Sequence, residues 1–196
     1  MAARRNVGRS LPKTLTDEQL DALLARPNLG CPTGLRNRVI LQVLWRCGLR
    51  ASEACGVHLR DIDWKVGEIR IRAEVAKGGR EAVSYLDPST QEWLDRWKLE
   101  RRRYAAGAPW LFCTLKGGQL DRRYIWEMVS RYARKAGIDE PVWPHRLRHT
   151  YATTLLGEGF NIEEVRRLMR HARLETTAVY LEVRDKDLRE KVRRRG

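Results

Sequence analysis

The sequence lacks any long apolar run. No stretch of the 196 residues approaches the roughly 18 consecutive apolar residues that a membrane-spanning helix needs. The N-terminal residues MAARRNVGRSLPKTL are basic, but no apolar segment follows them as it would in a secretory signal. We therefore expect a cytoplasmic protein that has no membrane partner.

Paired cysteines and acidic clusters are also missing. The four cysteines, Cys31, Cys47, Cys55 and Cys113, are scattered along the chain without a CxxC pair. This scatter favours buried free thiols in a reducing compartment over a disulfide framework. The sequence also shows no cluster of acidic residues that would hold a pair of Mg²⁺ ions.

Basic residues, by contrast, are in clear excess. The chain has 39 Lys and Arg against 25 Asp and Glu, which gives a formal net charge of +14. Such an excess on a folded domain commonly marks a polyanionic partner, most often nucleic acid. The hydrophobic share of 42%, with seven tryptophans, suffices for a real core. A chain of this length usually forms one domain.

The pattern along the chain indicates a mainly helical domain. Residues 1–12 show no periodicity and are expected to form a flexible basic arm. Thr16 and Gln19 have the spacing of a capping box, which predicts the start of a helix. The largely apolar residues 37–48 predict a central buried helix that ends at Gly48, followed by a tight turn and a short helix.

Two segments show the alternation of β-strands. Residues 68–72 and 82–86 alternate polar and apolar side chains, and the glycine pair between them suits a hairpin turn. The rest predicts helices over about 89–105, 122–136, 145–157 and 162–169, and a last, mostly charged helix over 185–194. We therefore expect the α+β class, mainly α, with a small antiparallel sheet.

The segment PHRLRHTYATTLL has the strongest local features of a binding site. Pro144 suits the first position of a helix, and His145 and Arg148 share one face of it. A helix N-terminus favours anions, so its backbone N–H groups and Arg148 could hold a phosphate. The alternative is a metal site, because His145 and His149 have i, i+4 spacing, but no carboxylate lies inside the motif as in HExxH.

Four more residues stand out in three other places. Arg50 lies at the N-terminal side of the predicted short helix, and Lys77 lies in the predicted hairpin turn. In HARLETTAVY, His171 precedes a polar turn and Tyr180 follows it. Each has an ordinary structural interpretation when taken alone: a solvated arginine, a turn lysine, or a tyrosine at the rim of the core.

Taken together, the order Arg, Lys, His-x-x-Arg, His, Tyr resembles the tyrosine recombinases, the phage-integrase family of site-specific DNA recombinases. The resemblance runs from about residue 12 to the end of the chain. It is carried by GLRASEACGVHLRDIDW, VAKGGREAVSYL, PHRLRHTYATTLLGEG and LMRHARLETTAVYLEV. It implies a catalytic domain over 13–182 and a C-terminal helix over 183–196. That helix either docks on a neighbouring subunit through Leu188 and Val192 or is simply solvated.

The resemblance implies a nucleophile and a phosphate clamp. Tyr180 would attack phosphorus and form a covalent 3′-phosphotyrosyl link. Because the reference pKa of tyrosine is about 10, this hydroxyl needs activation near neutral pH. Arg50 and Arg148 would clamp the non-bridging oxygens, since the guanidinium fork matches that geometry.

The resemblance also implies the proton transfers and the partners. His145 would act as base or proton relay, His171 would donate a hydrogen bond to the phosphate, and Lys77 would protonate the departing 5′-hydroxyl. The reaction is a transesterification, so neither ATP, a metal nor another cofactor is implied. The implied partners are double-stranded DNA and further copies of the chain, in a tetramer on DNA.

Two features depart from the family pattern, and two other functions stay open. Members usually carry an additional N-terminal helical domain, so we expect either an excised catalytic domain or a natural minimal form. Arg170 occupies a position that is typically glycine in the family, which bears on how the preceding helix ends. Type IB topoisomerases use a closely similar residue set, and a DNA-binding module that retains the fold without cleaving is the second alternative.

Overall fold

The computed structural model describes residues 13–170 of the chain. The predicted basic arm, the predicted C-terminal helix and the predicted site residues His171 and Tyr180 lie outside the described residues. Four of the six candidate site residues, and the predicted helices and strands between them, lie within the described residues.

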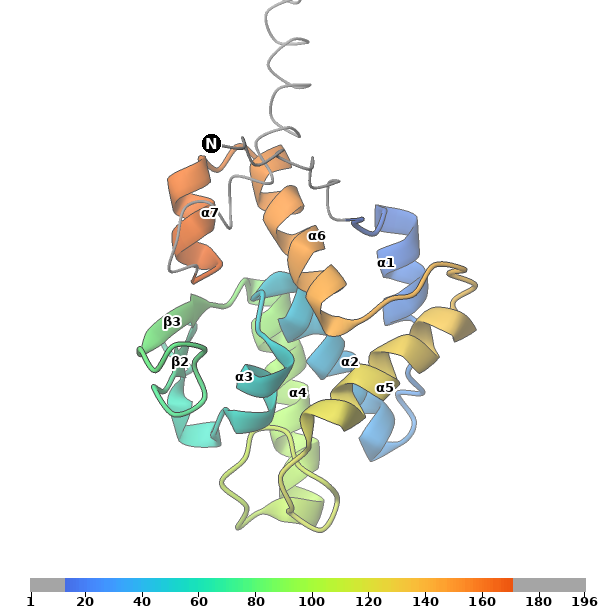
Figure 1. The fold of residues 1–196 in the computed structure, drawn as a ribbon. Coiled ribbons are helices and arrows are strands. Elements are labelled where there is room, and N and C mark those ends of the chain that lie inside the picture. The colour runs from blue at the N-terminus through green and yellow to red at the C-terminus, as the bar shows by residue number, and fades with distance from the viewer. Residues whose placement is uncertain (1–12, 171–196) are drawn as a thin grey trace, which may run out of the picture.

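Residues 13–170 fold into seven α-helices and one small sheet (Figure 1). The helices are α1 (Asp17–Leu24), α2 (Pro32–Arg46), α3 (Ala51–Gly56), α4 (Pro88–Ala105), α5 (Arg122–Lys135), α6 (Pro144–Gly157) and α7 (Ile162–Leu168). The strands β1 (Ile62–Asp63), β2 (Glu68–Ile71) and β3 (Ala82–Tyr85) form an antiparallel sheet in the order β1-β2-β3, and a 3₁₀ turn, η1 (Leu59–Asp61), precedes β1. The expected class, α+β and mainly α, is confirmed.

The predicted helix starts follow from local hydrogen bonding. The Thr16 hydroxyl accepts from the Gln19 N–H at 3.3 Å, and the Gln19 side chain accepts from the Thr16 N–H at 3.1 Å, so the capping box before α1 is formed. The central helix α2 begins earlier than expected, at Pro32. Proline suits this first helical position because its fixed φ is that of a helix. The N–H that proline lacks would have no hydrogen-bond partner within the helix at this position. The two-residue β1 was not predicted, because it is too short to show alternation.

The core is built around α2, which packs against both α4 and α6. Val39, Ile40, Leu41, Val43 and Leu44 of α2 are all fully buried. A second buried cluster lies between α6 and α7 and contains Tyr151, Ala152, Leu155, Leu156, Val165 and Met169.

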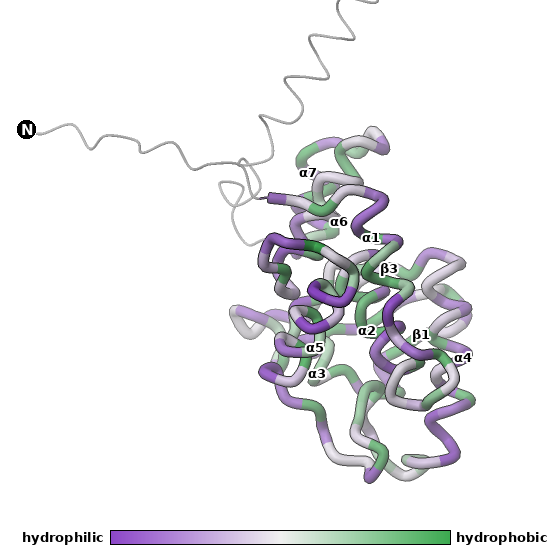
Figure 2. Tube along the Cα trace, turned by 90° about the vertical axis from the view of Figure 1, so that its right-hand side faces the viewer, coloured by the Kyte–Doolittle hydropathy of each residue, from purple (hydrophilic) through white to green (hydrophobic). Residues whose placement is uncertain are grey.

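Apolar and polar residues are interspersed along the helices, as Figure 2 shows. In the part of the chain that the structure describes, no helix combines the length and the apolar character that crossing a membrane requires. All four cysteines are free, as predicted; Cys47, Cys55 and Cys113 are buried and Cys31 is half-buried.

The turn between α2 and α3 depends on Gly48. Its φ of 55° lies in the left-handed region that favours glycine. A Cβ added to it would lie 2.6 Å from Cδ1 of Tyr151, so the space is closed as well. Both properties place the Gly48 carbonyl where an arginine of α6 reaches it, as the next subsection describes.

We predict that Gly48→Ala lowers the free energy of unfolding more than Gly137→Ala does. Gly137 has a similar φ of 73° but nothing within 4 Å of an added Cβ. Gly137→Ala therefore measures only the free-energy cost of placing an alanine at a positive φ. That cost is about 1–2 kcal/mol for either alanine. Overlap with Tyr151 should add about 1–3 kcal/mol at Gly48 alone. Urea unfolding of both variants measures the difference, and equal losses would contradict this account of the turn.

Candidate active site

Four of the six predicted site residues line one pocket. Arg50, Lys77, His145 and Arg148 all face a basic, open pocket of about 1200 Å³. They come from the N-terminus of α3, the loop between β2 and β3, and the first turns of α6.

Lys77 lies in a loop that is wider than a tight hairpin turn. The β2–β3 connection begins with a helical turn in which the N–H groups of Val75 and Ala76 donate to the Arg72 carbonyl. Gly78 and Gly79 follow with φ values of 94° and 66°, which brings the chain back toward β3. Lys77 is exposed at this bend and lines the pocket.

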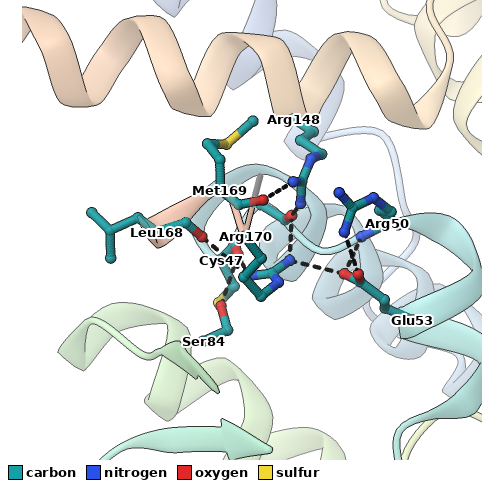
Figure 3. A network of polar contacts seen from close by, with 9 residues as sticks. Cys47, Arg50, Glu53, Ser84, Arg148, Leu168, Met169 and Arg170 are labelled. Atoms are coloured by element: carbon teal, nitrogen blue, oxygen red, sulfur yellow. Dashed lines mark hydrogen bonds and ion pairs between the residues drawn. The ribbon is translucent and has the colours of Figure 1, made fainter. Parts of the chain in front are cut away.

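Arg148 links the pocket to the core. Its side chain is only 1% exposed, although it lines the pocket. Nη1 donates to the Gly48 carbonyl in the α2–α3 turn, and Nη2 donates to the Met169 carbonyl just after α7 (Figure 3). The guanidinium orientation is thus set by two backbone segments that are far apart in sequence.

Arg50 is held by a buried carboxylate, Glu53. Nη1 of Arg50 donates to Oε1 of Glu53 at 2.6 Å, and the Arg50 backbone N–H donates to Oε2 at 2.9 Å. Oε2 also accepts from Nη2 of Arg170 at 2.8 Å (Figure 3). Glu53 is 1% exposed, so this carboxylate lies almost entirely among arginines. Desolvation raises its pKa, but Arg170 and Arg50 outweigh that effect and the pKa is lowered overall.

The pocket cations act on His145. Desolvation lowers the pKa of its imidazole, and the positive charges of Arg148, Arg50 and Lys77 lower it further. The ring is therefore neutral near pH 7 and has a nitrogen that can accept a proton. The influence of all three cations on one ring also shows that the four side chains form a single electrostatic unit.

His149 lies one helical turn beyond His145. The two rings meet edge to face with centroids 4.2 Å apart. Desolvation, with His145 and Arg148, lowers the pKa of His149 to about 4. For the alternative of a metal site, residues 13–170 contain no group of three or more His, Cys, Asp or Glu placed to hold an ion.

Several pocket residues were not singled out from the sequence. Arg122, Arg123 and Trp126 of α5 and Trp143 before α6 also line the pocket. Trp126 is 51% exposed and Trp143 is 40% exposed, unusual for so large an apolar side chain. The sequence did hold a sign of Trp126, because it falls outside the apolar series of its helix. Outside the pocket lining, Glu53 gave no such sign and Arg170 was noted only as a departure from glycine, because the two residues that pair here are 117 positions apart.

Comparison with known proteins agrees with this geometry. The sequence model of the phage integrase family matches residues 13–187. Tyrosine recombinase XerD of Pseudomonas putida is 36% identical over 180 residues, which cover 90% of this chain and 59% of that protein. XerD of Xanthomonas campestris pv. campestris is 39% identical over 182 residues, covering 88% of this chain and 55% of that protein.

The chain belongs to the phage integrase family. Its fold is also that of solved members: the crystal structure of XerA recombinase matches with a TM-score of 0.81 and 26% identity, covering 95% of this chain and 66% of that one. XerH site-specific recombinase, solved with its palindromic difH substrate in a post-cleavage complex, matches with a TM-score of 0.80 and 26% identity, covering 96% and 54%. The chain thus spans between half and two thirds of the length of these family members.

We predict that titration of His149 makes the chain less stable in mild acid. In the unfolded chain this histidine binds a proton near its ordinary pKa of about 6.5, whereas in the folded chain it does so only at about 4. Between these pH values the unfolded state binds more protons, so the free energy of unfolding falls as the pH drops from 6.5 toward 4.

Urea unfolding of the wild type and of His149→Gln at pH 8 and pH 5 tests this. The difference at pH 8 gives the structural cost of the substitution, because the histidine is neutral in both states there. The variant should lose less stability between pH 8 and pH 5 than the wild type. An identical loss in both would contradict the lowered pKa.

Proposed function

We propose that this chain is the catalytic part of a site-specific DNA recombinase that cleaves and rejoins strands through a covalent 3′-phosphotyrosyl intermediate. The observation that carries the proposal is the shared pocket of Arg50, Lys77, His145 and Arg148 in a member of the phage integrase family. Double-stranded DNA is the substrate, in agreement with the net charge of +14.

The two arginines form the phosphate clamp. Arg50 and Arg148 line the pocket from different helices, and each is oriented by bonds to protein acceptors. Such pre-set donors stabilise the charge of a pentacovalent phosphate without reorganising during the reaction. His171, which lies outside the described residues, donates a further hydrogen bond to the same phosphate.

Two proton transfers accompany strand cleavage. The Tyr180 hydroxyl attacks phosphorus and transfers its proton to neutral His145, while the bond from phosphorus to the 5′-oxygen breaks. Lys77, on the exposed loop, protonates that departing oxygen. Rejoining runs the same steps in reverse. No ATP is consumed, because the phosphotyrosyl link keeps the energy of the broken phosphodiester bond. The pocket cations neutralise the negative charge of the reacting phosphate.

The remaining pocket residues extend the DNA contact. Arg122 and Arg123 add positive charge at the start of α5, and Trp126 and Trp143 offer apolar faces for sugars or bases. The basic arm, 1–12, adds phosphate contacts outside the described residues. Its arginines raise affinity for all sequences alike and steepen the dependence on salt.

The C-terminal segment 183–196 docks on a neighbouring copy in a tetramer on DNA. An apolar groove of about 400 Å³ between β3, α6 and α7 is a fitting acceptor. Its lining includes Tyr85, which is 55% exposed, and Phe160, which is 38% exposed. The charged residues of the lining are Asp87, Glu158 and Arg46, so its net charge is negative. This complements a segment with six basic and three acidic residues over 185–196.

We predict that the wild type forms a covalent adduct on a nicked suicide DNA substrate and that Tyr180→Phe forms none. Arg148→Ala should lower cleavage by at least about 100-fold with a modest loss of DNA binding, because its contact matters most in the transition state. Denaturing gels measure the adduct, and a gel-shift titration of each variant supplies the binding control.

The same assay separates the alternatives. Binding without an adduct would favour the non-catalytic DNA-binding module. An adduct together with relaxation of supercoiled DNA by a monomer, without site preference, would favour the type IB topoisomerase. Strand exchange between two defined sites supports the recombinase.

We predict that removing residues 184–196 weakens subunit assembly on DNA while binding of a single copy is largely retained. Phe160→Ser in the acceptor groove should have the same effect, because it removes apolar contact area from the docked segment. Leu99→Ser is the matched control, since Leu99 is 64% exposed on α4 outside the groove. Analytical ultracentrifugation on a fixed DNA length measures assembly, and unchanged assembly of the truncated chain would rule out docking.

A further inference from the structure

Arg170 has a backbone conformation that is costly for its residue type. Its φ is 53°, and no other non-glycine residue in the described part of the chain has a positive φ. A side chain with a Cβ is disfavoured there, and glycine is the usual solution after a helix. An arginine in this conformation therefore calls for a compensating interaction.

The side chain supplies that interaction. It is 6% exposed and spans from the end of α7 to the α2–α3 turn. Nη2 donates to Oε2 of Glu53 and to the Gly48 carbonyl, both at 2.8 Å. Nη1 donates to the carbonyls of Cys47 at 3.3 Å and Leu168 at 3.2 Å (Figure 3).

The partners of Arg170 are the groups that orient the phosphate clamp. Glu53 also binds Arg50 through both the side chain and the backbone N–H. The Gly48 carbonyl also accepts from Arg148. Arg170 itself does not line the pocket, so it reaches the proposed site only through these shared acceptors.

We infer that Arg170 is a positioning residue of the proposed reaction, which fixes Glu53 and the Gly48 carbonyl so that Arg50 and Arg148 are held in their phosphate-binding orientation. This inference rests on the proposed function.

The buried carboxylate gives the inference a pH signature. The charged groups that face Glu53 are Arg50 at the start of its own helix, Arg148 from α6 and Arg170 after α7. Burial favours the protonated acid, and Arg170 is the strongest influence in the opposite direction. Without Arg170 the pKa of Glu53 rises. As the pH falls through the raised pKa, Glu53 takes up a proton and its hold on Arg50 weakens.

The experiment compares single-turnover adduct formation from pH 8 to pH 5.5 in the wild type and three variants. Arg170→Gly removes the side chain and suits the backbone. Arg170→Lys keeps a charge but loses the guanidinium fork. Arg170→Gly combined with Glu53→Gln also removes the carboxylate that titrates. Arg101→Lys is the matched control, because Arg101 is 1% exposed and donates to the backbone carbonyls of Trp110 and Ala108 away from the pocket.

At pH 7 we expect Arg170→Gly to cleave about 10- to 100-fold more slowly, as misplacement of catalytic groups does, with DNA affinity within about threefold of the wild type. Its deficit should widen toward pH 5.5 beyond the decline that protonation of His145 causes in every variant. Arg170→Lys should recover part of the rate. The double variant should lose the additional acid dependence, and Arg101→Lys should never show it.

Each other outcome overturns the inference. Wild-type rates and pH profile in Arg170→Gly would show that the clamp is set without this side chain. A loss that is equal at all pH values, and that follows the fraction unfolded as in Arg101→Lys, would show a structural role alone. If Arg170→Gly does not fold, the dependence of the Arg170→Lys cleavage rate on pH tests the inference by the same criteria. An absent adduct in the wild type would instead overturn the proposed function itself.

Discussion

The pocket depends on keeping several positive charges close together, and Glu53 makes that possible. Arg50, Arg148 and Arg170 would repel one another, but a carboxylate that is 1% exposed lies among them. Removing one partner from such a buried ion pair costs about 3–5 kcal/mol, because the remaining charge is left unpaired. The single negative charge therefore stabilises the folded chain and fixes where the guanidinium groups point.

Backbone carbonyls, rather than Glu53, orient Arg148. The carbonyls of Gly48 and Met169 accept from Arg148, so the ends of two helices that both pack against α6 define its orientation. The α2–α3 turn belongs both to the core and to the site, since the helix before it contributes fully buried residues to the core and Arg50 follows it. The packing of α2 thereby fixes the position of the α2–α3 turn. This turn then places Arg50 and the Gly48 carbonyl that accepts from Arg148.

The sequence predicted what depends on nearby residues. The apolar series on α5 and the capping box of α1 are local, and both helices formed where expected. Arg50, Lys77, His145 and Arg148 were selected by the order of their motifs, and the structure brings them to one pocket. The sequence marked Arg170 only as a departure from the usual glycine. Its pairing with Glu53 was not predicted, because the two residues are 117 positions apart and no local pattern encodes such a pair.

The electrostatics of the pocket give His145 a function that changes with its occupant. Burial and the positive charges of Arg148, Arg50 and Lys77 lower the pKa of the imidazole, so the ring is neutral near pH 7 and can accept a proton. A phosphodiester bound between Arg50 and Arg148 would bring a negative charge that offsets part of that effect and raises the pKa. In the proposed reaction the histidine would thus become a better proton acceptor once a substrate phosphate is in place, which would couple activation of the attacking hydroxyl to binding of the DNA.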